Sequence, residues 1–456
     1  MKDERDIAAL PHAKKTLKGS GHVLALNTGS IITPEAQAML GALHSRSIGG
    51  IESHLEVLAK RGSDNFMSIY YVGYGHKSIG DLGSATLFIE GVSMLAAKAI
   101  QDWPLYNGQE SSTRYIDFAQ QPFINPLGTK KGEETLEKWR TFYLKGLEVL
   151  VPELKKRHPI GEGEKESVYD KAINARAFDI MRGFLPAGAS TNLAWHGNLR
   201  QFADKLLVLR HHPLDEVKDI AGRAEEALIE AFPNSFGAKR YDETENYNKT
   251  QMEALTYFED EHPIDFELSQ DAVNRKMLSR YRNVLSKRPP KTELPKIIGE
   301  CGMVTFRFLL DFGSFRDIQR HRAVFQQMPL LTTSHGFHPW YMEELPEDFQ
   351  KEAKEVLGEQ EKAISSLECS REEKQYYTAM GYQITNQLTG NLPALIYLVE
   401  LRATRFVHPT LRFRAQEMAH ALKKKFSEDG LVIHLDEDSD RFDIKRGEQD
   451  IVQKEN

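Results

Sequence analysis

Two short clusters of polar side chains in this sequence could bind a charged ligand, and the first is the stretch ESSTRY that begins at Glu110. Ser112 and Arg114 could together bind a monophosphate, because a hydroxyl and a guanidinium both donate hydrogen bonds to phosphate oxygens. Glu110 could accept a hydrogen bond from a sugar or a base. A loop with a capping hydroxyl and a surface arginine explains the same residues equally well.

The second cluster is QRHR, which places Arg320, His321 and Arg322 side by side. The preceding residues DFGSFRDI predict a helix that carries this QRHR cluster in its last turn. Two guanidiniums at a helix end can bind a pyrophosphate bidentately, and the imidazole can pack on a planar ring or hydrogen bond to it. The alternative is a solvated cationic helix end that pairs with Asp311 and Asp317.

Composition limits the classes of protein to consider. The chain has 456 residues, of which 40% are hydrophobic and 27% charged, and this length predicts two domains or a repeat. The net charge of −7 disfavours a general nucleic-acid or membrane-surface binder, so a few placed cations must hold any anionic ligand. No apolar run is as long as a membrane span, and the polar start does not resemble a signal peptide, so we expect a cytoplasmic protein.

Motifs of several other chemistries are missing from the sequence. Cys301 and Cys369 are the only cysteines, and no CxxC spacing occurs, so the sequence predicts neither a disulfide framework nor a zinc ribbon. It has no Ser-His-Asp order, glycine-rich phosphate loop or HExxH pair, and therefore nothing favours a hydrolase or a P-loop protein.

Internal similarity indicates a tandem repeat. The apolar runs ATLFI and VTFRF each continue into a helix-prone segment, and we expect a strand followed by a helix in both places. A threonine lies in each run at the same spacing, with Thr86 fifteen positions before Gln101 and Thr305 fifteen positions before Arg320.

A second pair of segments, HGNLRQFADKLLVLRHHP and TGNLPALIYLVELRATRFVHP, repeats the order Gly-Asn-Leu, Leu-Arg and His-Pro. Asn198 and Asn391 would be the N-caps of two helices, whose side-chain oxygens accept orphan backbone amides, or they would contact a ligand there. Arg210 and Arg402 would close the same helices, where a cation complements the helix dipole.

The repeat predicts two units, 1–236 and 237–456, that meet in a polar, charged stretch. We expect a helix over 251–285 to open the second unit. The charge-dense residues from about 436 predict a loosely ordered tail, after a short strand at 431–435.

The order of these motifs resembles the flavin-dependent thymidylate synthases, the ThyX family. In that family Arg-His-Arg and Glu-x-Ser-x-Arg-Tyr lie in one continuous stretch. Here the first copy keeps ESSTRY but has Gln101, Asp102 and Trp103 where Arg-His-Arg belongs, and the second keeps the cations but has MPLLTT where ESSTRY belongs. The resemblance implies an α+β fold made of two copies of a ThyX-like unit, each mainly an antiparallel sheet flanked by helices, that form an intrachain pseudo-dimer.

The resemblance also implies which residues would bind the flavin. The second copy departs from the family at Pro393, which takes the place of the arginine in Asn-x-Arg. The implied flavin-binding residues are Arg320, His321, Arg322, His76, Ser78, Glu300, Asn198, Arg200 and Asn391.

For the nucleotide the resemblance implies a site for deoxyuridine monophosphate. The second copy has Gln375 at the position that matches Arg182. Arg210 and Arg402 match a catalytic arginine that polarises the uracil ring in the family, and Ser112 would contact the anion rather than act as a nucleophile. The implied nucleotide-binding residues are Glu110, Ser112, Arg114, Tyr115 and Arg182.

The implied reaction is the reductive methylation of deoxyuridine monophosphate, with FAD as cofactor and methylene-tetrahydrofolate and NADPH as co-substrates. Family sites form between subunits, so the two repeats would build composite sites, and a homodimer of tandem chains would replace a tetramer. Each chain would then assemble fewer complete sites than two ordinary subunits. Two alternatives stay open: a flavin- or pyrimidine-nucleotide-binding protein without turnover, and a flavoenzyme that acts on another pyrimidine nucleotide.

Overall fold

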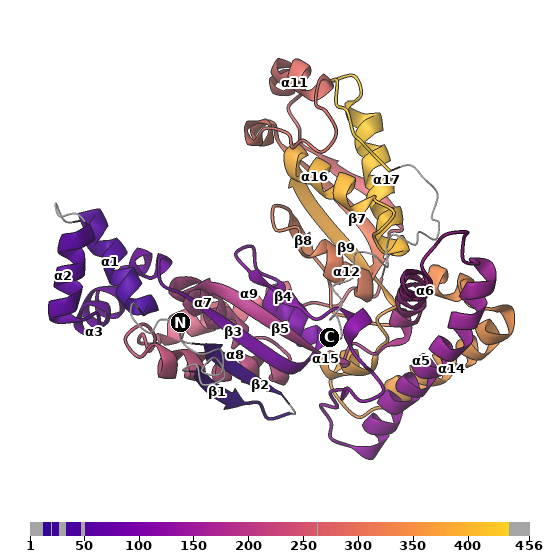
Figure 1. Cartoon of the computed structure of the whole chain (residues 1–456), viewed down its shortest axis with the longest axis horizontal. Coiled ribbons are helices and arrows are strands. Elements are labelled where there is room, and N and C mark those ends of the chain that lie inside the picture. Colours follow the sequence, from indigo (N-terminus) through magenta and orange to yellow (C-terminus); the bar gives the residue numbers. More distant parts are fainter. Residues whose placement is uncertain (1–11, 20, 27–32, 47–50, 262, 437–456) are drawn as a thin grey trace. The chain divides into compact units, whose positions relative to one another are not determined.

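The computed structural model describes residues 12–19, 21–26, 33–46, 51–261 and 263–436, and these form a mixed α+β fold with antiparallel sheets, as predicted (Figure 1). The chain divides into two compact units, called unit 1 and unit 2 here. Unit 1 is drawn from residues 1–112, 121–126 and 189–256, and unit 2 from residues 113–120, 127–188 and 257–456. None of the described helices is long and apolar enough to cross a membrane.

In the described part of unit 1, five strands form an antiparallel sheet in the order β1-β2-β3-β5-β4. Alternate side chains of β3 such as Leu87 and Ile89 are fully buried, as expected when one face of a sheet packs on the core. β3 leads directly into α4, which confirms the strand and helix predicted for this segment. The strands are β1 (His12–Thr16), β2 (His22–Leu26), β3 (Ser84–Ser93), β4 (Asn107–Glu110) and β5 (Ser190–Asn198).

Helices of unit 1 pack on this sheet. α8 contacts β1 and β2, and α4 and α7 contact β5. The helices are α1 (Pro34–Arg46), α2 (Ile51–Arg61), α3 (Asp64–Phe66), the π-helix η2 (Met67–Gly73), the 3-10 helix η3 (Lys77–Asp81), α4 (Met94–Gln101), α7 (Leu199–Leu209), α8 (Asp215–Ala231) and α9 (Asp242–Leu255).

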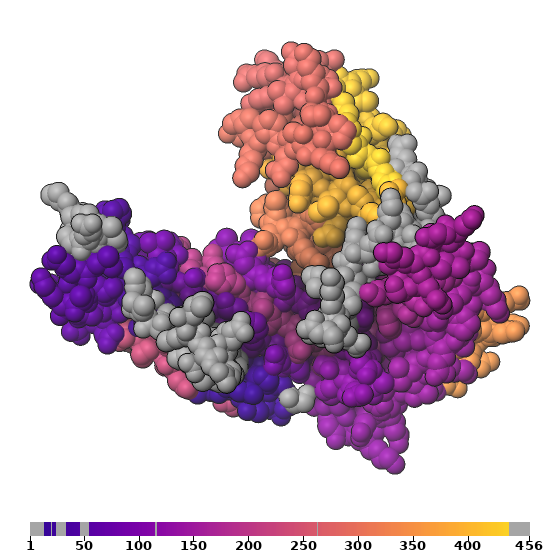
Figure 2. Space-filling view, viewed as in Figure 1, coloured from indigo at the N-terminus to yellow at the C-terminus, as the bar shows by residue number. Residues whose placement is uncertain are grey.

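In the described part of unit 2, four strands form an antiparallel sheet in the order β6-β7-β9-β8. β7 leads into α12, which confirms the second predicted strand and helix. The segment with α10 and α11 (salmon) lies beside α17 (yellow), where Arg275 stacks 4.0 Å above the ring of Phe426 (Figure 2). The strands are β6 (Phe266–Asp271), β7 (Met303–Asp311), β8 (Phe325–Gln327) and β9 (Gln383–Asn391).

A second part of unit 2 is helical, with α5 packed on α6 and α14 (Figure 1). Trp139 of α5 is fully buried and donates its indole hydrogen to the backbone oxygen of Tyr377 at 2.8 Å. The helices of unit 2 are the 3-10 helix η4 (Thr113–Tyr115), α5 (Lys130–Arg157), α6 (Glu166–Met181), η5 (Arg182–Phe184), α10 (Arg275–Leu278), η6 (Ser279–Tyr281), α11 (Arg282–Ser286), η7 (Lys296–Cys301), α12 (Phe312–Ile318), α13 (Pro339–Glu343), α14 (Glu347–Ser365), α15 (Arg371–Lys374), η8 (Gln375–Tyr377), α16 (Leu392–Arg402) and α17 (Pro409–Phe426).

The order of elements repeats along the chain. β3, α4, β4, β5 and α7 follow one another as β7, α12, β8, β9 and α16 do, and the sheet neighbours match. Thr86 faces His196 across β3 and β5 with 3.0 Å between Oγ1 and Nδ1, and Thr305 faces Thr389 across β7 and β9 with 2.9 Å between hydroxyls. The two compact units nevertheless do not coincide with the two predicted repeats, because residues 127–188 of the first repeat belong to unit 2. The repeat boundary near 236 and the pseudo-dimer therefore stay predictions.

Both predicted N-caps are confirmed. The side-chain oxygen of Asn198 accepts a hydrogen bond from the backbone nitrogen of Gln201 at 2.8 Å, and that of Asn391 from Ala394 at 3.1 Å. Arg210 follows the last residue of α7 and Arg402 is the last residue of α16, as predicted.

Two local predictions in this part of the chain are wrong. The helix expected over 251–285 ends at Leu255, and β6 lies within that range. Residues 431–435 form no strand, because side chains bind their backbone: Arg288 donates to the oxygen of Val432, and Glu400 accepts from the nitrogen of His434. The predicted tail from 437 onward lies outside the described residues.

The helix expected through the QRHR cluster is shorter than predicted. α12 ends at Ile318, and the cluster follows it. Gln326 donates from Nε2 to the backbone oxygens of Ile318 and His321 at 3.1 and 3.0 Å, which satisfies carbonyls that a longer helix would have paired.

Candidate functional site

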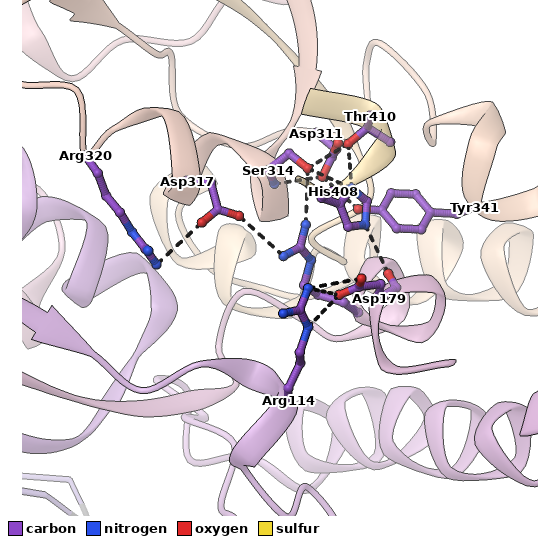
Figure 3. Close-up of polar contacts among 10 residues, drawn as sticks. Arg114, Asp179, Asp311, Ser314, Asp317, Arg320, Tyr341, His408 and Thr410 are labelled. Carbon is purple, nitrogen blue, oxygen red and sulfur yellow. Dashed lines mark hydrogen bonds and ion pairs between the residues drawn. The ribbon is translucent and has the colours of Figure 1, made fainter. Parts of the chain in front are cut away.

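Arg114 of the ESSTRY stretch is held by a buried carboxylate within unit 2. Its Nε and Nη2 atoms donate hydrogen bonds of 2.9 to 3.1 Å to Asp179 of α6 (Figure 3). The Asp179 side chain is only 2% exposed. Such a bidentate, charge-assisted pair fixes the guanidinium, and it anchors η4 to α6.

Arg182 directly follows α6 and lies buried against α12. Its Nη2 donates to the Ser314 hydroxyl at 3.2 Å, and its Nη1 lies 3.8 Å from a carboxylate oxygen of Asp317. The other oxygen of Asp317 lies 3.5 Å from Nη2 of Arg320 (Figure 3). Asp317 therefore links an arginine of the first half of the sequence to one of the QRHR cluster. Its pairing with Arg320 is the one given above as the alternative to ligand binding.

The carboxylate of Asp317 stays ionised among several arginines. Burial by itself would raise the pKa of Asp317, but Arg320, Arg182, Arg402 and Arg316 outweigh it and hold the pKa below its ordinary value. Asp179 and Asp311 lie near Arg182 as well, so this buried guanidinium is compensated by several carboxylates.

Asp311 organises the start of α12 rather than pairing with the QRHR cluster. Its Oδ2 accepts hydrogen bonds from the backbone nitrogen of Ser314 at 2.9 Å and from the hydroxyl of Tyr341 at 2.8 Å (Figure 3). The Ser314 hydroxyl lies 2.6 Å from that of Thr410 and 3.2 Å from Nδ1 of His408. These groups are buried, so this network supports the fold beneath Arg182 and does not face a ligand.

The three residues of the QRHR cluster point in different directions. His321 is buried, and its Nε2 accepts a hydrogen bond of 2.7 Å from Nε of Arg402. Burial and the charge of Arg402 lower the pKa of His321 to about 3, so the ring is neutral. Arg322 is exposed, and the Arg320 side chain is 56% exposed. The two outer cations can therefore meet an anion, whereas the ring packs inward.

In unit 1, other side chains fill the position that matches the QRHR cluster. Gln101 donates from Nε2 to Glu110 at 2.7 Å, so the first residue of ESSTRY already has a protein partner. The amine of Lys205 is buried, donates to the backbone oxygen of Asp102 at 2.7 Å, and lies 5.4 Å above the ring of Trp103.

A pocket in unit 1 brings together residues of two predicted motifs. It has a volume of about 210 Å³, and both Arg200 and Arg210 line it. Arg200 pairs with Asp81 at 3.4 Å and with Asp204 at 3.6 Å. Asn198 is turned into the cap of α7, so its side-chain oxygen faces the helix.

The remaining predicted residues are not part of the contacts described above. His76 and Ser78 are exposed at the start of η3, and Ser112 is half-buried at the end of one segment of unit 1. Glu300 is exposed in η7, and Asn391 caps α16. The side chain of Tyr115 lies outside the described residues.

Sequence reasoning missed several partners of the predicted arginines, among them Asp179, which binds Arg114, and Glu245, which lies 3.5 Å from Nε of Arg210. These side chains meet their arginines across long stretches of sequence, and no local spacing marks them. His408 could have been found from the repeated His-Pro motif, because in both copies Nδ1 of the histidine contacts the residue two positions further on. Nδ1 of His212 accepts from the backbone nitrogen of Leu214 at 3.2 Å, and Nδ1 of His408 lies 2.9 Å from the Thr410 hydroxyl.

Comparisons with known proteins give a matching family model and several similar proteins. Residues 34–234 match the family model described as "Thymidylate synthase complementing protein". A UPF0159 protein of Chlamydia pneumoniae is 25% identical, over 92% of this chain and 89% of its own. A UPF0159 protein of Chlamydia muridarum is 27% identical over 76% of both chains, and one of Thermoplasma acidophilum is 24% identical over 80% of this chain and 87% of its own. Among the described residues, no group of histidines, cysteines and carboxylates could hold a metal ion.

Proposed function

We propose that the protein is a flavin-dependent, thymidylate synthase-like methyltransferase, because residues 34–234 match the family model described as "Thymidylate synthase complementing protein". It would methylate deoxyuridine monophosphate with FAD, methylene-tetrahydrofolate and NADPH.

One observation carries this proposal. Arg114 and Arg182, which the family resemblance assigns to the nucleotide, lie in the same compact unit as Arg320, which it assigns to the flavin. Asp317 connects Arg182 to Arg320 directly. Segments from both predicted repeats thus contribute to one cluster, which supports composite sites.

The residues of unit 2 fit the anionic part of FAD. Arg320 and Arg322 lie two positions apart in sequence and are both exposed, and they would hold the pyrophosphate. When bound, the flavin supplies the hydride for the reduction. The buried His321 ring is held by its hydrogen bond from Arg402 and would pack beneath the two cations.

The chain would act on the nucleotide by binding and polarisation. Ser112 and Arg114 would contact the phosphate, and the hydrogen bond from Arg114 to Asp179 would hold the guanidinium in place for it. Arg210 would donate to a carbonyl oxygen of the pyrimidine and stabilise negative charge that develops on the ring.

A second candidate is a flavin- or nucleotide-binding protein without turnover, or a flavoenzyme for another pyrimidine nucleotide. One feature favours it: Arg114 and Arg182 already have carboxylate partners, and Arg182 is 7% exposed. A substrate phosphate would compete with Asp179 and Asp317 for these cations.

Tritium release from [5-³H]deoxyuridine monophosphate tests the proposal, since methylation at that carbon expels the label. The purified chain, with FAD, NADPH and methylene-tetrahydrofolate, should release tritium and should rescue a thymidine-requiring strain. A yellow protein that releases none would favour the second candidate. We also propose a homodimer of tandem chains, which the mass in solution would check.

A further inference from the structure

We propose that a groove on unit 2 binds residues 441–446 of the same chain, RFDIKR, with Phe442 as the apolar anchor. This segment lies outside the described residues. The groove is lined by residues of α13, of the start of α17, and of β7 and β9, and its volume is about 650 Å³. None of the residues that line it belongs to the flavin or nucleotide sites implied by the family resemblance.

The apolar wall of the groove is incompletely covered. Phe413 lies on α17 between two buried arginines, yet it is 52% exposed. Pro339 is exposed in the same groove, and Trp340 is half-buried. Exposed aromatic and proline side chains that gather in one groove are typical of a contact site for another segment of chain.

The described chain reaches the edge of this groove at Asp436. The backbone oxygen of Asp436 accepts hydrogen bonds from Nη2 of Arg412 at 3.2 Å and from Nε2 of Gln416 at 3.4 Å, and both side chains line the groove. The carboxylate of Asp436 accepts from the backbone nitrogen of Arg405 at 3.1 Å. The residues after Asp436 therefore start from a fixed point beside the groove.

Phe442 is close enough in sequence to enter the groove from that point. It follows Asp436 by six positions, and six extended residues span at most about 20 Å. Phe413 is the neighbour of Arg412 on α17, and Arg412 contacts Asp436 directly. The Phe442 ring can therefore reach Phe413 without a long connecting loop.

The pattern of residues 441–446 suits such a groove. Phe442 and Ile444 are two positions apart, so an extended segment would turn both side chains to one face. Arg441, Lys445 and Arg446 are cations, and Asp443 is the single carboxylate of the segment. The segment thus combines one apolar face with a positive charge.

The charges of the groove are complementary to that segment. Arg412 and Arg414 are buried, and they already bind the carbonyl of Asp436 and the carboxylates of Asp265 and Glu417. The Asp265 side chain is 79% exposed, and Glu343 is exposed too. The accessible rim therefore presents carboxylates, which attract cations and disfavour an anionic ligand.

Binding of a labelled peptide to the full chain tests the proposal. A tethered segment acts at an effective concentration in the millimolar range, so in the wild-type chain it should exclude a fluorescein-labelled peptide of residues 437–446. Phe442→Asp should vacate the groove, and fluorescence anisotropy should then show at least tenfold tighter peptide binding. Ile451→Asp is the matched control, because it makes the same change in charge at an apolar residue beyond the segment, and it should bind the peptide like the wild type.

Substitutions in the groove locate the binding. Phe413→Asp, combined with Phe442→Asp, should weaken peptide binding at least tenfold, and Glu343→Lys in the same background should weaken it at least threefold. Both side chains are exposed, and circular dichroism checks that the variants fold. If the Phe413 variant does not fold, the Glu343 variant decides.

Three binding results would overturn the proposal: equal peptide binding by the wild type and Phe442→Asp, no binding by Phe442→Asp, or unchanged binding after the groove substitutions. A mass in solution that falls in Phe413→Asp but not in Phe442→Asp would assign the groove to a second copy of the chain and would also overturn it. Neither flavin nor nucleotide enters these titrations, so their outcome is separate from that of the proposed function.

Discussion

Nε of Arg402 donates a hydrogen bond of 2.7 Å to Nε2 of His321, so a cation that ends α16 is bound to the neutral ring at the centre of the QRHR cluster. The imidazole must then carry its hydrogen on Nδ1. The QRHR cluster thus has two exposed guanidiniums, before and after His321 in the sequence, and an imidazole ring that Arg402 holds by a hydrogen bond.

This bond predicts a pH dependence of stability. Burial lowers the pKa of His321 to about 3, while its unfolded value is about 6.5. Between these values the unfolded chain binds the extra proton, so the free energy of unfolding should fall as pH decreases from about 6.5 toward 3. The slope for this one group approaches about 1.4 kcal/mol per pH unit. His321→Gln keeps an acceptor but does not titrate, and denaturant unfolding at pH 4–6.5 should show a shallower slope. Identical slopes would contradict this account.

The buried amine of Lys205 gives a second window of the same sign, at alkaline pH. Burial, with help from Lys98, lowers its pKa to about 8, and the unfolded value is about 10.5. The folded state therefore holds a costly charge below pH 8, and stability should rise between pH 8 and 10.5. Lys205→Met should stabilise the chain at pH 7 by about 2 kcal/mol, and this advantage should shrink above pH 8. Lys60→Met, on an exposed side chain, is the control in the same denaturation series.

Asp317 should matter for stability because it compensates a buried guanidinium. Asp317→Asn leaves Arg182 with one carboxylate fewer, and we expect a loss of about 2 kcal/mol in the free energy of unfolding. Asp348 pairs with Lys351 at 3.6 Å on a fully exposed side chain, so Asp348→Asn should change stability by less than about 0.5 kcal/mol. Similar losses of unfolding free energy in both variants would show that the link between Arg182 and Arg320 through Asp317 does not stabilise the fold.

Substitutions should separate flavin binding from nucleotide binding. Arg320→Ala should remove bound FAD, whereas Ser112→Ala or Arg114→Ala should weaken nucleotide binding but leave FAD in place. Arg371→Ala is a matched control, since its side chain is 53% exposed against 56% for Arg320. Flavin absorbance after gel filtration measures occupancy, and full occupancy in Arg320→Ala would remove the QRHR cluster from the flavin site.

The number of flavins should be one per chain. In unit 1, the positions that match the QRHR cations are occupied by Gln101, Asp102 and Trp103. Glu110 accepts a hydrogen bond from Gln101, and Lys205 contacts Asp102 and Trp103. No guanidinium pair is available at that position for a second pyrophosphate. Flavin released on denaturation, divided by chain concentration, should therefore approach one, and a ratio near two would require a second site.

The sequence predicted local features well and long-range partners poorly. Asn198 and Asn391 are recognisable because an N-cap and its helix are adjacent in sequence. The end of α12 was misjudged because Gln326, eight residues beyond Ile318, binds the carbonyl there. Asp179 could not be assigned to Arg114, because 65 residues separate them and only the packing of η4 on α6 brings them together.

Unit 2 draws residues 127–188 from the first half of the sequence and joins them to the second half. Phe142 of α5 stacks on Phe349 of α14 with 5.0 Å between ring centres, and Gln360 donates to the backbone oxygen of Thr135 at 2.8 Å. A chain that ended at residue 236 would keep α5 and α6 but would lose α14, which packs on α5. The two predicted repeats should therefore depend on each other for folding, and we expect neither to fold as a separate chain.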